Sequence, residues 1–186
     1  MAIRLAVTEP RLLTVAEFLE IQFPDGVKAE LDKGVIRLMG GGSTGHARVQ
    51  MNLYRFLGNA LRGSGCRPYG SDAAIETAES LRYPDLTIAC GPQNDEDGKV
   101  LAEPRVIMEV LSPGTRGHDE TDKLAEYLAL PSVETVVLVD PLIERVRIVQ
   151  RLGPDEWNDR RHPAPADVAL PSLGITIPHG EIFATD

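Results

Sequence analysis

The sequence is poor in the residues from which thiolate and imidazole metal sites are built. Its two cysteines, Cys66 and Cys90, lack the close spacing of a redox pair and have too few companions for a metal cage. We therefore expect reduced, partly buried thiols. The four histidines are scattered at positions 46, 118, 162 and 179, which argues against a zinc site. Any metal site in this chain must use oxygen ligands.

Long apolar runs are also missing. No stretch approaches the ~18 consecutive apolar residues of a membrane-spanning helix. Residues 1–19 do not combine a basic region, an apolar run and a cleavage site, so they do not resemble a signal peptide. We expect a cytoplasmic protein without membrane contact.

Positive charge is scarce as well. The formal net charge of -9 argues against a protein that coats nucleic acid non-specifically, because such binding draws its affinity from neutralised phosphates. Acidic residues gather at 94–99 and 118–122, so part of the negative charge is expected near loops and sites. A local basic groove is not excluded by the net charge.

The length and composition set the domain organisation. The chain has 186 residues and is 42% hydrophobic, which is enough for one domain with a core and too little for two. We expect a single α/β domain over residues 1–186. Beyond residue 153 the chain is rich in proline, which predicts an irregular C-terminal strap over 153–186 with short edge strands.

Three segments have helical signatures. Thr14 and Glu17 form a capping box, and Leu13 is placed to pack on Phe18, so a short helix is expected to begin there. After the glycine-rich segment 40–45, apolar residues recur at helical spacing over 46–63. A third helix is expected over 118–130, where Pro131 stops it.

The remaining segments read as strands. Two short strands flank the turn residues 32–34, which suits an N-terminal β-hairpin with Glu30 in its first strand. Apolar runs at 67–76, 83–90 and 104–112 predict buried central strands. Segments 135–140 and 145–151 are expected to form a C-terminal hairpin that turns near Asp140 and Pro141.

Two carboxylates interrupt this pattern. Asp85 follows Pro84 at the head of one apolar run, and Glu109 lies inside another. Burying a carboxylate is costly unless it is paired or binds a cation. If both strands belong to one sheet, the two side chains can share an edge and offer the oxygen ligands that Mg²⁺ prefers.

Each carboxylate also has a structural interpretation. Asp85 can be a turn residue after proline, and Glu109 can be the buried partner of Arg105 or Arg82. Two carboxylate-bearing strands followed by a helix that carries Lys123 form a more specific pattern than any one residue. We therefore favour a functional site.

From about residue 12 to about residue 150, the chain resembles the PD-(D/E)XK nuclease superfamily. The resemblance is to a bacterial group of restriction-endonuclease-like proteins of unknown cellular role. It is carried by Glu30, by Pro84 and Asp85, by the segment EVLSPGT that begins at Glu109, by the spacing of Asp119, Lys123 and Tyr127, and by the strand end VVLVDP. It implies a restriction-endonuclease-like core with a central mixed β-sheet flanked by helices.

The lysine departs from the superfamily pattern. That pattern places it two residues after the glutamate, where this chain has Leu111, and in the resembled group a lysine on the next helix takes its role, here Lys123. Lys123, Tyr127 and Leu130 share one stripe of the expected helix, which would turn the lysine toward the sheet. For any isolated lysine, a solvated surface position is the ordinary alternative.

The resemblance assigns roles to these residues. It implies that Asp85, Glu109 and the backbone carbonyl of Val110 bind Mg²⁺, with Mn²⁺ as a substitute, and that Glu30 adds an indirect or second-metal contact. Lys123 would orient or deprotonate the attacking water. The reaction implied is metal-assisted hydrolysis of a phosphodiester.

Further residues are candidates for substrate contact. His46 begins the second helix, where the resembled group carries a histidine, and it is either a phosphate contact or a surface residue. Arg116 precedes the lysine helix and is a candidate phosphate contact, and Tyr127 is a candidate on the lysine stripe. Arg48, Arg55 and Arg62 recur every seven residues, which suits either a stripe that tracks a nucleic-acid backbone or a solvated face, and we favour the solvated face.

The sequence supports two functional hypotheses. The first is a Mg²⁺-dependent endonuclease that acts on DNA as a homodimer, since cutting two strands needs two sites. The alternative is a catalytically silent module that keeps the fold to bind nucleic acid or protein. Retention of Glu30, Asp85, Glu109 and Lys123 together favours the first.

Overall fold

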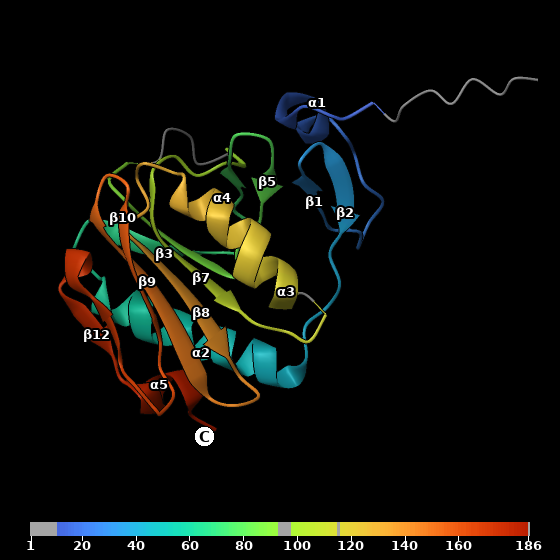
Figure 1. Cartoon of the computed structure of the whole chain (residues 1–186). Helices are drawn as coiled ribbons and strands as arrows, with labels where there is room; N and C mark the ends of the chain where they lie inside the picture. The colour runs from blue at the N-terminus through green and yellow to red at the C-terminus, as the bar shows by residue number, and fades with distance from the viewer. Residues whose placement is uncertain (1–10, 93–97, 115, 186) are drawn as a thin grey trace, which may run out of the picture.

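A six-stranded mixed sheet forms the centre of the computed structural model, which describes residues 11–92, 98–114 and 116–185 (Figure 1). All neighbouring strands are antiparallel except β7 and β8, which are parallel. In spatial order the strands are β10 (Glu156–Arg161), β9 (Arg145–Gly153), β8 (Thr135–Asp140), β7 (Pro104–Val110), β6 (Leu86–Cys90) and β3 (Cys66–Gly70). The expected mixed sheet is confirmed. Residues 94–97 of the acidic segment expected at 94–99 lie outside the described residues.

Helices cover both faces of this sheet (Figure 1). Helix α2 (Thr44–Ala60) packs Val49, Leu53 and Leu57 against one face. The other face is covered by α3 (Arg116–His118), a π-helical turn (Asp119–Lys123) and α4 (Leu124–Leu128). Because strand residues alternate between faces, Met108 faces α2 and its neighbour Glu109 faces the π-helical turn.

A second sheet of four short strands lies beside the first (Figure 1). Its order is β2 (Val35–Leu38), β1 (Ala29–Asp32), β5 (Leu81–Arg82) and β4 (Ile75–Glu76). The predicted hairpin of β1 and β2 is confirmed, and its turn residues Lys33 and Gly34 have positive φ angles, as a tight hairpin turn requires. Helix α1 (Val15–Leu19) covers this sheet with Phe18 and begins at the predicted capping box.

The segment 67–76 differs from its prediction. It is not one buried strand: β3 ends at Gly70, a turn follows in which Ala73 N–H donates to Gly70 carbonyl, and β4 joins the other sheet. β3 is also an edge strand and only partly buried. The apolar pattern could not reveal this change of sheet, because pairing partners are far away in sequence.

The lysine-bearing helix is shorter and less regular than predicted. Its middle turn, Asp119–Lys123, is π-helical, and the last helical residue is Leu128, so Leu130 lies beyond the helix. Single π-helical turns are frequently found at functional sites. In the described part of the chain, no helix is both long and apolar enough to cross a bilayer.

The C-terminal region is more regular than the predicted strap. The hairpin of β8 and β9 is confirmed, and β10 extends it as a sheet edge where an irregular segment was expected. The expected short strands are present as the pair β11 (Val168–Leu170) and β12 (Ile175–Ile177), joined by a 3-10 turn (Pro171–Leu173). Helix α5 (His179–Phe183) then packs Ile182 and Phe183 in the same core as α2.

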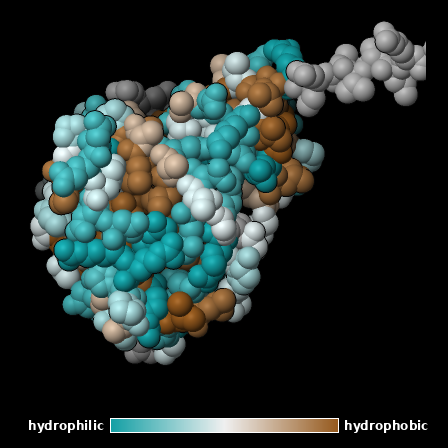
Figure 2. Space-filling model, viewed as in Figure 1, coloured by the Kyte–Doolittle hydropathy of each residue, from teal (hydrophilic) through white to brown (hydrophobic). Residues whose placement is uncertain are grey.

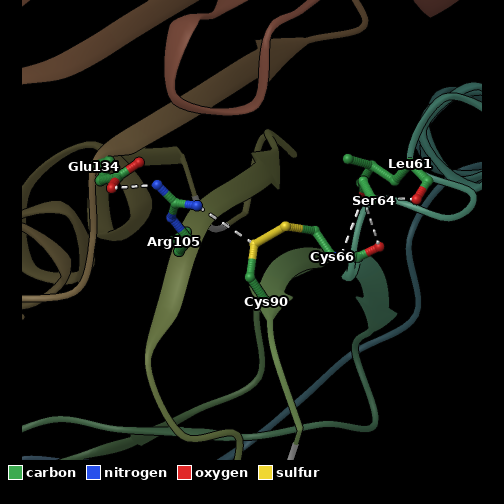
Figure 3. Close-up of a disulfide and its surroundings, with 6 residues drawn as sticks. All are labelled: Leu61, Ser64, Cys66, Cys90, Arg105 and Glu134. Carbon is green, nitrogen blue, oxygen red and sulfur yellow. Dashed lines mark hydrogen bonds and ion pairs between the residues drawn. A yellow bond between two sulfur atoms is a disulfide. The ribbon is translucent and has the colours of Figure 1, made fainter.

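The prediction of reduced thiols is wrong. Cys66 and Cys90 form a disulfide between β3 and β6 (Figure 3). The two residues are direct partners in the antiparallel pairing, so their side chains project from the same face. Their separation of 24 residues had concealed this contact. The disulfide fixes the edge strand to the strand that Asp85 precedes.

Candidate active site

Asp85 and Glu109 meet at one end of two central strands. Asp85 directly precedes β6, and Glu109 lies near the end of β7, which pairs with β6. The N–H of Val110 donates to Asp85 Oδ2 at 2.8 Å, and the N–H of Asp85 donates to Glu109 Oε2 at 3.3 Å. Each carboxylate is therefore held by the backbone of the other strand. The structural alternative for Glu109 does not apply, because the described ion pairs of Arg82 and Arg105 lead to other carboxylates. Asp85 does lie at a bend before β6, as its alternative proposed.

Lys123 lies among three carboxylates. Its Nζ is 3.6 Å from Glu109 Oε1, 3.4 Å from Glu30 Oε2 and 3.4 Å from Asp119 Oδ1. The side chain is buried, so the solvated alternative for this lysine is wrong. In the part of the chain that the structure describes, Glu30 Oε2 and Asp119 Oδ1 have no hydrogen-bond donor. One ammonium thus faces more negative charge than it neutralises.

Burial decides the protonation of Glu109. Desolvation raises its pKa to about 7; Lys123 opposes this shift, while Asp85 and Asp119 reinforce it. For Lys123, burial lowers the pKa, but the carboxylates of Glu109, Glu30 and Asp119 outweigh burial and the net shift is upward. Lys123 is therefore a protonated ammonium at neutral pH, which favours orienting a water over deprotonating it.

The raised pKa of Glu109 predicts a pH-dependent stability in metal-free protein. The neutral acid is favoured in the folded state, so its contribution is complete below the ordinary pKa of 4.5 and is lost as pH rises through about 7. We expect the free energy of unfolding, relative to Glu109→Gln, to fall by on the order of 3 kcal/mol across this range. Urea unfolding of both proteins in chelator would measure it. A pH-independent difference would contradict the assignment.

Tyr127 orients Glu109 and does not line the open cleft. Its ring is fully buried, and its hydroxyl donates to Glu109 Oε1 at 2.6 Å. Burial and the neighbouring Glu109 raise the pKa of Tyr127 well above its ordinary value, so it stays a donor. The predicted substrate contact of Tyr127 is therefore replaced by a positioning contact.

Helix α2 presents three polar side chains to Asp85. His46 Nε2 is 3.1 Å from Asp85 Oδ2, Gln50 Nε2 donates to the Asp85 carbonyl at 3.0 Å, and the Tyr54 hydroxyl donates to the same carbonyl at 2.5 Å. The hydrogen bond with Asp85 raises the pKa of His46. Gln50 and Tyr54 were missed in the sequence, although their spacing of four residues beside the apolar stripe was a usable signal.

Arg82 has contacts that the sequence did not predict. It is fully buried, and its guanidinium donates to Glu30 Oε1 at 3.2 Å, Asp32 Oδ1 at 2.5 Å and Glu126 Oε1 at 2.7 Å. These contacts join the four-stranded sheet to α4. Arg82 also fixes the orientation of Glu30, whose other oxygen faces Lys123.

A cleft of about 720 Å³ opens above these groups. Its walls include the glycine-rich segment 40–42, where a Cβ on Gly42 would lie 2.8 Å from His46 Nδ1. Its lining residues with ionisable side chains are Glu30, Arg37, His46, Tyr83, Asp85, Glu109, His118, Asp119 and Lys123.

Arg116 lies outside this cleft and pairs with Asp140 at 2.6 Å. Among the arginines interpreted as a solvated face, Arg48 donates to the carbonyls of Phe183 and Ala184.

The donor set fits Mg²⁺ better than a transition metal. Within residues 11–92, 98–114 and 116–185, no three His, Cys, Asp or Glu side chains form a complete metal site by themselves. Mg²⁺ commonly takes one or two carboxylates and completes its shell with water and phosphate oxygens. Asp85 and Glu109 supply two carboxylates, and the excess negative charge around Lys123 favours a cation.

Comparison with known proteins places this geometry in context. The family model described as "Uma2: Putative restriction endonuclease" matches residues 15–178. The uncharacterized protein slr1290 of Synechocystis sp. (strain ATCC 27184 / PCC 6803 / Kazusa) is 26% identical over 166 residues, covering 88% of this chain and 87% of the relative. The uncharacterized protein sll1609 of that organism is 31% identical over 157 residues, covering 82% and 89%.

A solved structure shares the fold. The protein described as "a putative nuclease belonging to DUF820" from Anabaena variabilis ATCC 29413 matches with a TM-score of 0.75 and 18% identity. The match covers 92% of this chain and 98% of that chain. The mixed sheet flanked by helices is therefore the fold of a nuclease-like protein.

Proposed function

The chain belongs to the Uma2 family within the restriction-endonuclease-like PD-(D/E)XK superfamily, and on this basis we propose that it is a Mg²⁺-dependent endonuclease that hydrolyses phosphodiester bonds in DNA. One observation carries the proposal. Asp85 and Glu109 are fixed in one cleft, and the Lys123 ammonium lies 3.6 Å from Glu109. Carboxylates and a cation so placed serve metal-assisted hydrolysis.

The metal ligands in this proposal are Asp85, Glu109 and the Val110 carbonyl. Mg²⁺, or Mn²⁺ as a substitute, would polarise the phosphate and lower the pKa of a bound water. The chain contributes by orienting these ligands: Val110 N–H holds Asp85, and the Tyr127 hydroxyl holds Glu109. Glu30 contributes indirectly, because Arg82 aims it at Lys123.

Lys123 would orient the attacking water and stabilise negative charge on the phosphate. Its upward-shifted pKa keeps the proton on the ammonium, so a base role is disfavoured. His46 lines the cleft beside Asp85, and the hydrogen bond with Asp85 raises its pKa, so His46 is the better placed candidate for contact with a substrate phosphate. Arg116, paired with Asp140 outside the cleft, has a weaker case as a phosphate contact.

The alternative is a module that binds nucleic acid or protein without catalysis. The buried, mutually oriented carboxylates argue against it, because a silent module gains nothing from keeping buried carboxylate oxygens without hydrogen-bond donors. Catalysis is therefore the better supported hypothesis.

Plasmid cleavage tests the proposal. We expect purified protein with Mg²⁺ to nick or linearise supercoiled DNA, and Lys123→Met to lower the rate by about 10²-fold or more. Lys99→Met is the matched control, since Lys99 is exposed and does not line the cleft. Equal cleavage by all three proteins would contradict the catalytic proposal, because the activity would not depend on Lys123. DNA binding without Mg²⁺- or Mn²⁺-dependent cleavage by any of them would support the silent module.

A further inference from the structure

In the part of the chain that the structure describes, no strand pairs with the outer edge of β2, and this strand is mostly apolar. We propose that two copies of this chain form a two-fold dimer by pairing their β2 edges, which joins two four-stranded sheets into one. A second copy of this chain is the occupant to which the geometry of the strand points.

The exposure of β2 is the first observation. It is the outermost strand of its sheet, and all four of its residues are exposed. Val35 is 52%, Ile36 39% and Leu38 72% exposed, and Leu12 beside the hairpin turn is 60% exposed. Figure 2 shows brown, apolar surface over the region of α1 and the β1–β2 hairpin. Open apolar edges of this kind are templates for strand pairing.

Along a strand, the backbone groups of successive residues point alternately to the two sides. The pairing of β2 with β1 therefore shows which backbone groups of β2 point outward, toward a second copy. Met39 N–H donates to the Lys28 carbonyl of the facing strand, so residues 35, 37 and 39 direct their backbone groups toward β1. The backbone groups of Ile36 and Leu38 therefore point outward. Gly34 follows the same alternation, and its outward carbonyl already accepts from Leu13 N–H.

The alternation of outward backbone groups limits how β2 can align with β2 of a second copy. Pairing Ile36 with itself would place Leu38 opposite Gly34, whose carbonyl is already used. Pairing Leu38 with itself would place Ile36 opposite Gly40, beyond the end of β2. The remaining register pairs Ile36 with Leu38 of the partner subunit, keeps both pairs within β2 and centres the two-fold axis on Arg37. It places apolar side chains against apolar side chains on the face that carries buried Ala29 and Leu31. That self-complementarity favours a second copy over an unrelated partner.

The charges on the opposite face are compatible with this register. Arg37 meets Arg37 of the partner subunit, and like charges directly opposite are unfavourable when unpaired. Each Arg37 is already paired with Asp32 of its own chain and lies opposite Glu30. Across the joint, the side chains therefore follow in the order Glu30, Arg37, Arg37 of the partner subunit and Glu30 of the partner subunit. Each arginine has an acidic neighbour, so charge repulsion does not oppose the contact.

The dimer also has a consequence for the cleft, and this step rests on the proposed function. Arg37, Leu38 and Met39 line the cleft next to the proposed joint. Directly opposite residues of antiparallel strands project from the same face. Both clefts would then open on one side of the joined sheet, which suits a substrate with two strands.

Sedimentation of the whole chain tests the dimer without any assay of activity. We expect wild-type protein to show close to twice the 20.2 kDa mass of one chain, and Leu38→Lys to show the single mass. The matched control is Leu142→Lys, because Leu142 is 67% exposed on the β8–β9 turn, and this variant should stay dimeric. A monomeric wild type up to about 100 µM, or a dimeric and folded Leu38→Lys, would overturn the proposal.

Cysteine cross-linking tests the register. Both native cysteines are held in the Cys66–Cys90 disulfide, so an introduced thiol is the free one. Arg37→Cys would face its copy at about 4.5 Å between Cα atoms, within reach of a disulfide, and should give a covalent dimer on oxidation. Ile36→Cys should cross-link far less. The reverse order would show that the register is wrong, and cross-linking by neither variant would count against the pairing. Loss of DNA cleavage with the dimer intact would refute only the proposed function.

Discussion

Glu109→Gln is expected to lower Mg²⁺-dependent cleavage by on the order of 10³-fold or more, because it removes an anionic metal ligand without changing its shape. Glutamine can keep a hydrogen bond with each partner of the Glu109 carboxylate. Its oxygen can accept from Asp85 N–H, and its amide can donate to the Tyr127 hydroxyl oxygen. The fold should therefore survive, and single-turnover cleavage of plasmid would measure the loss.

Metal binding gives a second readout of the same change. Mg²⁺ or Mn²⁺ should raise the unfolding temperature of the wild type, since a ligand that binds only the folded state stabilises it. Glu109→Gln and Asp85→Asn should lose most of this shift. Gln22→Glu, a surface change remote from the cleft lining, should retain it. Retention of the metal-dependent shift by both site variants would place the metal elsewhere.

Arg82→Met is expected to have the largest effect on stability, at about 3–5 kcal/mol, because it removes the cation that three carboxylates share in a largely buried network. Glu30, Asp32 and Glu126 all accept from this guanidinium, and Arg82 itself is fully buried. Methionine fills much of the same volume, so the loss would report charge and hydrogen bonding more than packing. Urea unfolding near neutral pH is the measurement.

Two controls sharpen this prediction. Arg55→Met removes an exposed ion pair with Glu181 and should cost less than about 1 kcal/mol. Arg82→Lys keeps the charge but loses the planar donor fork, so an intermediate loss is expected. If Arg82→Met is no less stable than Arg55→Met, the buried network does not hold the second sheet to α4.

Local patterns in the sequence predicted much of the secondary structure. The Thr14 capping box, the hairpin around Lys33 and Gly34, helix α2 and the β8–β9 hairpin all follow from spacings of a few residues. Such features are set by neighbours along the chain, so they are readable without knowledge of the fold. The family resemblance, confirmed by the comparisons, also came from short motifs.

Contacts between distant segments were not readable in this way. The disulfide depends on the register of β3 against β6, and the partners of Arg82 come from β1 and α4. A pattern of apolar residues fixes which face of an element is buried, but not which distant element covers it. The wrong prediction for the cysteines and the failure to predict the partners of Arg82 share this cause.

Asp85 and Glu109 illustrate which features the sequence determines and which depend on the tertiary structure. By itself, the sequence determined that two carboxylates interrupt apolar strands and that Lys123 follows on a helix, because burial pattern and spacing are local properties. Only the tertiary structure decided that Lys123 lies within 3.4–3.6 Å of three carboxylates and that α2 supports Asp85. Strand pairing and helix docking set those distances, and both are determined by the packing of the whole chain.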